Sequence, residues 1–131
     1  GPRTKEGWNT TPEGEKYQAE KVAQFYTVLF SHPAVEAITW WDFTDQGAWQ
    51  RAPAGFLRKN LSPKPAYDKL KSLIKDKWWT KTKLTLAEGG RARFRGFFGQ
   101  YKMTARAAGR QLTGTFYFDK TTKKTIDVRL T

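Results

Sequence analysis

Cysteine is absent from the 131 residues, and His32 is the only histidine. Without cysteine, the chain has no disulfide framework, thiolate metal site or cysteine nucleophile. A single imidazole also excludes a zinc site built from several histidines, so we expect neither a metal nor a cofactor. No apolar run approaches the roughly 20 residues that a bilayer span needs, and no basic-then-apolar signal segment opens the chain. These absences predict a soluble protein without a membrane partner.

Acidic residues are half as numerous as basic ones. Lys and Arg number 24 against 12 Asp and Glu, which gives a formal net charge of +12. Residues 1–79 hold 12 basic and 9 acidic side chains, whereas residues 80–131 hold 12 and 3. The secondary-structure signals change near the same point, so we expect two domains, 1–79 and 80–131. The positive charge favours anionic partners without naming one.

The first half has the pattern helix, buried strand, loop, helix. Residues 10–13 start a helix, with a hydroxyl cap, a proline whose missing N–H costs nothing, and an acid in the first turn. One apolar stripe then follows a helix from about residue 15 to residue 30, formed by Val22, Phe25, Tyr26, Leu29 and Phe30. The apolar run 37–43 is typical of a parallel-sheet strand buried on both faces. A second helix starts within residues 62–65 and has one apolar face, formed by Ala66, Tyr67, Leu70, Leu73, Ile74 and Trp78.

The second half alternates between apolar and polar residues and is interrupted by turn residues. Strand-like runs separated by glycine-containing or polar turns occupy residues 84–86, 91–98, 101–107, 112–118 and 125–130. We therefore expect about five antiparallel strands in a small β-sandwich or barrel. The predicted class is α/β followed by all-β.

Three tryptophans and two aspartates cluster within residues 40–49. In a strand-helix fold, ligands bind at the carboxyl end of a parallel strand, where this cluster lies. A sugar needs flat rings beside polar groups, because its C–H bonds form an apolar face while its hydroxyls seek hydrogen bonds. Adjacent strand residues point to opposite faces, so one of Trp40 and Trp41 is expected in the core and the other at a site. The candidate substrate-binding residues are Trp41, Trp49, Trp40 and Asp45.

The stretch from Ser31 to Asp45, with Trp49 and residues 62–67, resembles the C-terminal end of glycoside hydrolase family 10. These enzymes are mostly endo-1,4-β-xylanases on a (β/α)₈ barrel. The resemblance covers roughly residues 14–79 and implies the seventh helix, eighth strand and eighth helix of that barrel. In the family, a tryptophan ending the last strand forms the floor of the sugar subsite next to the scissile bond, and a second one eight residues later covers it. Trp41 and Trp49 have that spacing.

Two positions depart from the family, which has Gly at the position of Asp42 and a small aliphatic residue at that of Trp40. The segment 90–101 is similar to a β-rich extension that follows the barrel in some members. Family members carry one catalytic glutamate in Asn-Glu-Pro and the other in Thr-Glu, and neither sequence occurs here. Retaining glycosidases need two such carboxyl groups about 5 Å apart. The resemblance thus implies a truncated xylanase with no catalytic residue of its own, although Asp42 and Asp45 remain as a substitute pair or as a solvated pair that hydrogen-bonds the turn.

Three functions stay open at this point. A polysaccharide-binding module would use the tryptophans, helped by Tyr101, Phe116 and Tyr117, and its positive charge would attract xylan that carries uronate groups. An active endo-1,4-β-xylanase would require the rest of the barrel or other copies of the chain. Nucleic-acid binding would use arginines interleaved with Phe94, Phe97 and Tyr101, but charge alone supports it.

Further expectations concern assembly and location. A barrel takes about 250 residues, so one strand and two helices cannot close it. Apolar surface at Val22, Phe25, Leu29 and Leu73 is therefore expected to pack on the β-domain, on further copies or on a missing barrel partner. The family resemblance also implies a secreted or extracellular protein.

Overall fold

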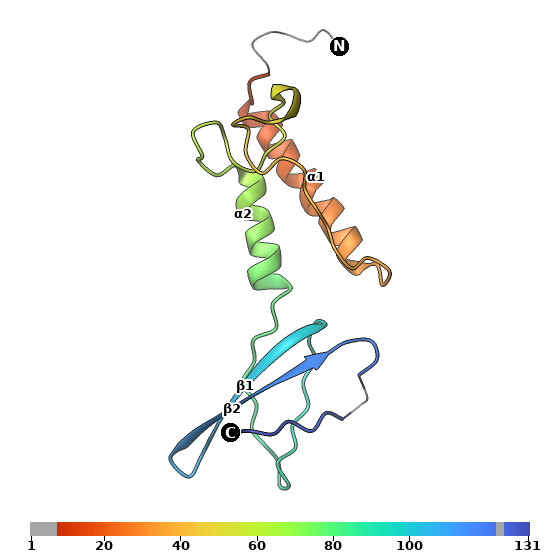
Figure 1. The fold of residues 1–131 in the computed structure, drawn as a ribbon, viewed down its shortest axis with the longest axis vertical. Helices are drawn as coiled ribbons and strands as arrows, with labels where there is room; N and C mark the ends of the chain where they lie inside the picture. The colour runs from red at the N-terminus through yellow and green to blue at the C-terminus, as the bar shows by residue number, and fades with distance from the viewer. Residues whose placement is uncertain (1–7, 123–124) are drawn as a thin grey trace. The chain divides into compact units, whose positions relative to one another are not determined.

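The computed structural model describes residues 8–122 and 125–131. The described elements are two α-helices, two short helical turns and one two-stranded sheet (Figure 1). The chain divides between Trp78 and Trp79 into two compact units. The helices belong to the first unit and the sheet to the second, and each unit is described by itself.

The first helix, α1, extends over Pro12–Ser31. Its start follows the predicted capping pattern, because Thr11 Oγ1 accepts the backbone N–H of Gly14 at 3.1 Å. Pro12 occupies the first turn, where a backbone N–H has no partner within the helix. The predicted first helix is confirmed, and α1 extends beyond the predicted range at both ends.

The second helix, α2, covers Pro65–Ser72 and continues as a π-helix, η2, over Leu73–Lys77. The wider π-turn brings the N–H of Trp78 to the carbonyl of Leu73 at 2.8 Å. It also positions the Trp78 ring over Phe30 of α1, with the ring centroids 4.1 Å apart and the planes nearly parallel. The predicted second helix is therefore confirmed, and its end ties α2 to α1.

Helices α1 and α2 lie side by side and bury one core between them (Figure 1). The buried members of this core are Ala19, Val22, Tyr26, Phe56, Ala66, Leu70 and Leu73. The expectation that Val22 and Leu73 need an outside cover was wrong, because the two helices cover each other. Phe25 lies outside this contact and stays 51% exposed.

The buried parallel strand expected at residues 37–43 is not formed. This segment is irregular, and the nearest ladder contact is an isolated parallel bridge between Thr44 and Leu57. A strand of a parallel sheet is held by hydrogen bonds to flanking strands, and the described residues contain no strand parallel to this run. In consequence Trp41 and Phe43 are exposed rather than buried.

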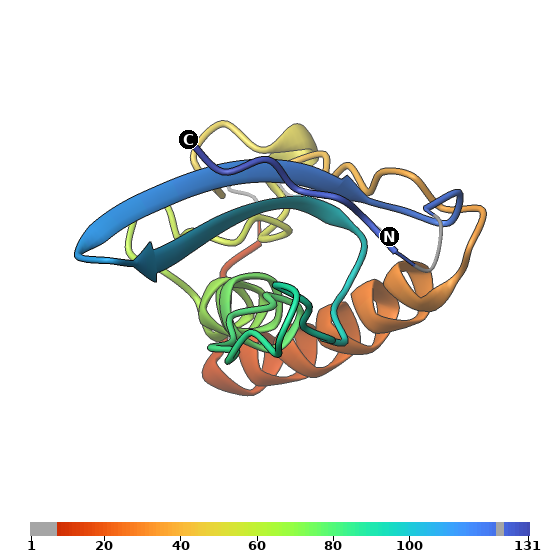
Figure 2. The ribbon, with the colours of Figure 1, turned by 90° about the horizontal axis from the view of Figure 1, so that it is seen from below.

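The second unit is built on an antiparallel hairpin of β1, Gly99–Ala107, and β2, Arg110–Phe118. The two strands run beside each other along their whole length (Figures 1 and 2). Ala108 and Gly109 connect them with φ values of 48° and 74°. A two-residue hairpin turn of this kind needs a positive φ at both positions, which explains the glycine.

The five-stranded sandwich or barrel was wrong for the described residues. Segments 84–86, 91–98 and 125–130 form no strand, although Thr131 exchanges two backbone hydrogen bonds with Thr113 at 2.9 and 3.0 Å. Alternation of apolar and polar residues predicts an extended backbone with two faces, but it names no hydrogen-bonding partner. The described part of the unit is therefore a hairpin flanked by irregular segments.

Candidate functional site

The two tryptophans expected to contact a sugar both have open indole rings. Trp41 is 85% exposed and Trp49 is 67% exposed. The two residues are linked through Asp42, which follows Trp41 and whose carboxylate accepts the N–H of Trp49 at 3.4 Å. Asp42 thus takes the turn-bonding role that was one of its two expected alternatives.

Trp40 points the other way and belongs to the core of the first unit. Its ring lies 4.8 Å from that of Phe56 and 6.3 Å from that of Tyr26. Its indole N–H donates to the carbonyl of Ala54 at 3.1 Å, and the Gln18 amide of α1 donates to the same carbonyl. The expected division between one inward and one outward tryptophan is confirmed, and Trp40 anchors the backbone from which Trp41 projects.

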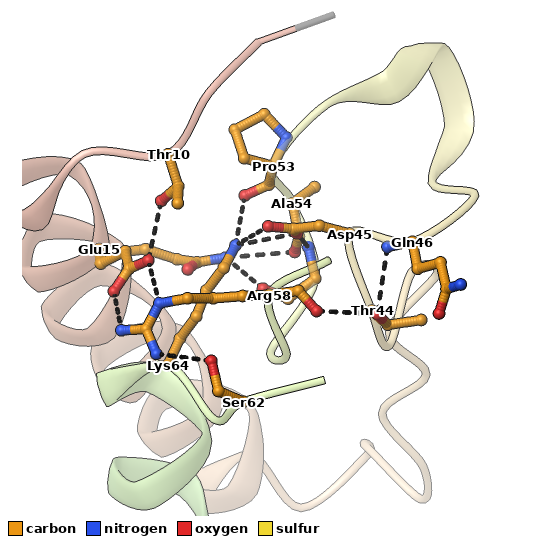
Figure 3. Close-up of polar contacts among 12 residues, drawn as sticks. Thr10, Glu15, Thr44, Asp45, Gln46, Pro53, Ala54, Arg58, Ser62 and Lys64 are labelled. Carbon is orange, nitrogen blue, oxygen red and sulfur yellow. Dashed lines mark hydrogen bonds and ion pairs between the residues drawn. The ribbon is translucent and has the colours of Figure 1, made fainter. Parts of the chain in front are cut away.

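Asp45 is buried, and its side chain lies beside Lys64 and Pro53 (Figure 3). Its carboxylate pairs with Lys64 Nζ at 2.8 Å, and the side chains of Asp45 and Lys64 are 3% and 0% exposed. The same carboxylate accepts the N–H of Gly55 at 2.9 Å, while Lys64 also donates to the carbonyl of Pro53 at 2.9 Å. Asp45 is therefore not a solvated loop carboxylate. It joins residues 45, 53, 55 and 64 in one buried network, whose contacts stabilise the loop.

Gly55 lies where two backbone segments approach closely. A Cβ atom at this position would meet the backbone of Thr44 at 2.5 Å and that of Asp45 at 2.7 Å. Only glycine allows the hydrogen bonds on either side of this contact, from the N–H of Phe56 to Phe43 and from the N–H of Asp45 to Leu57, both at 2.9 Å. The loop is thus fixed by its backbone as well as by the ion pair.

A second ion pair ties the loop to the start of α1. The Arg58 guanidinium binds the Glu15 carboxylate through two nitrogens, and Glu15 also accepts the Thr10 hydroxyl (Figure 3). Arg58 further donates to Ser62 and to the carbonyl of Pro63. The hydrogen bond from Arg58 holds the pKa of the buried Glu15 carboxyl below its ordinary value, against the opposing effect of burial.

The Trp49 turn has an unusual backbone. Gln50 and Arg51 both adopt positive φ values, 54° and 55°. For residues other than glycine this conformation costs on the order of 1 kcal/mol each, so the contacts around the turn must hold it in place. Next to it lies an open hollow of about 470 Å³, lined by Asp45, Gln46, Gly47, Ala48, Arg51 and Lys59. Strained turns of this kind concentrate at binding sites.

Lys64 and Arg58 were missed by the sequence reasoning. Lys64 entered the sequence analysis only as part of a helix start and of the family motif, and Arg58 not at all, although a lysine is rarely fully buried unless it is paired. The spacing gave no hint, because the partners lie 19 and 43 residues away along the chain. The two acids of the loop, Asp42 and Asp45, were the signal in the sequence that could have suggested a buried cation as their partner.

Neither a cluster of metal-ligating side chains nor a free aspartate pair is found at the tryptophan loop in the described residues. No three histidine or acidic side chains gather closely enough to hold a metal ion in residues 8–122 and 125–131. Asp45 is engaged by Lys64, and Asp42 by Trp49.

No helix in the described part of the chain combines the length and apolar character needed to cross a membrane.

The sequence profile of glycosyl hydrolase family 10 matches residues 4–73, which is more than half of the chain. The chain belongs to glycosyl hydrolase family 10. The match covers α1, the loop with both exposed tryptophans and the whole of α2. The helix-loop-helix of the first unit is thus a segment of the family's barrel.

Two known proteins are similar to the chain over part of their length. Endo-1,4-beta-xylanase B of Thermotoga neapolitana is 32% identical over 71 residues, covering 47% of this chain and 20% of that enzyme. Anti-sigma-I factor RsgI6 of Acetivibrio thermocellus is 30% identical over 102 residues, covering 78% of this chain and 13% of that protein. The chain therefore spans a fifth or less of either relative. Neither relative nor the family points to nucleic-acid binding.

The match to the anti-sigma factor is longer than the first unit, which ends at Trp78. Part of the second unit is consequently similar to that relative too.

Proposed function

We propose that this family 10 segment binds a xylan or related β-glycan through Trp41 and Trp49. The observation that carries the proposal is the pair of open indole rings, 85% and 67% exposed, on one loop in which Asp42 bonds to the N–H of Trp49. Exposed tryptophans cost solvation free energy, and each indole offers a flat apolar face on which a sugar ring can stack. The family resemblance implies the same two positions as floor and cover of a sugar subsite.

Trp40 and Asp45 have a different role in this proposal. Both are held inside the first unit, Trp40 by the Ala54 carbonyl and Asp45 by Lys64. They position the two open tryptophans and do not contact the sugar. Asp45 was predicted to bind sugar, and in this proposal it instead holds the loop in place through its ion pair with Lys64.

The experiment is affinity electrophoresis in gels that contain xylan, glucomannan or soluble cellulose. Xylan should retard the chain, and the retardation should persist at high salt because stacking is not screened. Trp49→Ala and Trp41→Ala should each weaken binding by about 1–2 kcal/mol, or roughly 5- to 30-fold. Tyr17→Ala, which removes a ring on α1 that is 62% exposed, is the control and should bind like the unmodified chain. Equal retardation of all these variants would refute the tryptophan site.

A second candidate is a role within an active endo-1,4-β-xylanase, favoured by the similarity to xylanase B. Here the segment supplies one wall of the substrate cleft, and glutamates from the rest of a barrel perform hydrolysis. The purified chain should then release no reducing sugar from xylan by itself. Hydrolysis by the chain alone would contradict both this candidate and a pure binding role.

We also propose a cover for the exposed side of α1, where Phe25 and Val28 are 51% and 65% exposed. Further copies of the chain or a barrel partner would bury these side chains. Light scattering tests the first possibility, since a clean monomer excludes self-assembly.

The family resemblance supports an extracellular location, where the polysaccharide is encountered.

A further inference from the structure

The β1–β2 hairpin has two unlike faces. Tyr101 of β1 and Phe116 of β2 are cross-strand partners with stacked rings 5.2 Å apart. Phe94 packs beside both of them, with ring centroids at 5.3 and 6.1 Å. This face is therefore apolar, with an aromatic cluster at one end and Met103, Ala105 and Leu112 toward the turn. The help of Tyr101 and Phe116 in sugar binding stays a prediction, and their stacked rings leave Tyr117 as the exposed ring of the three.

The opposite face is open and polar. Strand alternation and the pairing register bring eight side chains to it in four cross-strand pairs: Gln100 with Tyr117, Lys102 with Thr115, Thr104 with Thr113, and Arg106 with Gln111. Seven of these residues are exposed and Thr113 is half-buried. No hydrogen bond or ion pair joins these side chains to another residue in the described part of the chain.

We call this open face, formed by the four cross-strand pairs, the hairpin face. It carries no carboxylate and no aliphatic side chain. Five members are neutral hydrogen-bonding residues, two are cations, and Tyr117 is a ring with 68% exposure. Residues 80–131 as a whole contain 12 basic and 3 acidic side chains. One of the three acids, Asp119, is already engaged with Thr121 and Thr122 in the turn after β2. The surrounding charge thus favours an anionic ligand.

We propose that the hairpin face binds a polysaccharide carrying scattered uronate groups, such as a glucuronate-substituted xylan. Its amides and hydroxyls match the sugar hydroxyls, and Tyr117 offers one ring for stacking. Lys102 and Arg106 stand four residues apart on β1, about 13 Å at the rise of a strand, so they meet carboxylates that are widely spaced. This second site lies in a unit of its own and does not depend on Trp41 or Trp49.

The spacing argues against a single-stranded nucleic acid. Such a ligand carries a phosphate on every nucleotide, and proteins bind it with dense cations and several stacking rings. The hairpin face holds two cations and one open ring. Phe94 and Tyr101, which the nucleic-acid alternative requires, are packed together on the other face.

The test measures binding of the full chain to two probes, soluble glucuronoxylan and the same polymer with its uronates reduced to neutral sugar. The double variant Lys102→Gln/Arg106→Gln removes both cations of the hairpin face. Lys81→Gln/Lys83→Gln is the matched control, because it removes two exposed charges elsewhere in the same unit. Trp41→Ala/Trp49→Ala separates this site from the tryptophan site.

The unmodified chain should bind glucuronoxylan roughly fivefold more tightly than the reduced polymer at low salt, since individual exposed ion pairs contribute little. This preference should disappear in Lys102→Gln/Arg106→Gln and persist in the other two double variants. The proposal is overturned if the preference survives loss of Lys102 and Arg106, or if loss of Lys81 and Lys83 removes it equally. Tighter binding of an oligothymidylate than of glucuronoxylan would also overturn it and favour nucleic acid.

Discussion

Replacing Lys64 by methionine is the sharpest test of how the tryptophan loop is held. Methionine keeps the unbranched shape of the lysine stem but removes its charge and its three hydrogen-bond donors. The Asp45 carboxylate would then stay buried with the N–H of Gly55 as its remaining donor. The carbonyl of Pro53 would lose the hydrogen bond from Lys64 as well.

The magnitude follows from burial. The side chains of Asp45 and Lys64 are 3% and 0% exposed, so water cannot replace the missing partner without opening the loop. Removing one member of a buried ion pair costs about 3–5 kcal/mol, a large part of the roughly 5–15 kcal/mol by which domains are stable. A neutral pair should cost less, because Asp45→Asn in the Lys64→Met background removes the unpaired charge. We expect the double variant to be at least about 1 kcal/mol more stable than Lys64→Met alone.

Urea unfolding followed by the helical circular dichroism signal measures these differences. Lys59→Met is the matched control, since Lys59 is an exposed lysine of the same loop and its loss should stay within about 0.5 kcal/mol. A cost below about 1 kcal/mol for Lys64→Met would refute the reasoning. So would a double variant less stable than Lys64→Met.

Three further outcomes are expected in the first unit. The low pKa of Glu15, caused mainly by Arg58, implies a stability contribution that is complete above the ordinary value of 4.5 and is lost as the pH falls through the folded-state pKa. Urea midpoints should therefore fall more steeply with acidification in the unmodified chain than in Glu15→Gln, and parallel profiles would contradict this. Gly55→Ala should lower the free energy of unfolding by about 1–3 kcal/mol, because its Cβ would meet the Thr44 backbone at 2.5 Å. An unchanged melting temperature would contradict this and show that the backbone can shift without cost. Thr11→Ala should lower stability by about 1 kcal/mol through loss of the helix cap, a decrease that Thr11→Ser should largely avoid.

Local features of the first unit were predictable from the sequence. The cap at Thr11 and the proline after it act within a few residues, so the start of α1 can be predicted from the local sequence. The opposite orientation of Trp40 and Trp41 was equally predictable, because neighbouring residues of an extended backbone point to opposite sides. The family motif further suggested that Trp41 and Trp49 form a sugar subsite. The binding experiments above test that suggestion.

Features that depend on distant partners were not predictable in this way. An apolar run such as 37–43 has the composition of a buried strand, but forming one requires flanking strands that are absent from the described residues. Asp45 has the appearance of an exposed loop acid until the chain brings Lys64 to it from 19 residues away. The alternating second half likewise suggested five strands, of which β1 and β2 are joined by the local turn between them.

Tryptophan indole N–H signals in a two-dimensional NMR titration test the central claim most directly. Each of the six tryptophans carries one indole N–H, and Trp41→Phe and Trp49→Phe assign their signals by loss of one signal each. During titration with a soluble xylooligosaccharide, the account predicts saturable shifts of the Trp41 and Trp49 signals and little change at Trp40, whose N–H is bonded to Ala54. Unmoved signals from both open indoles at saturating sugar would contradict it.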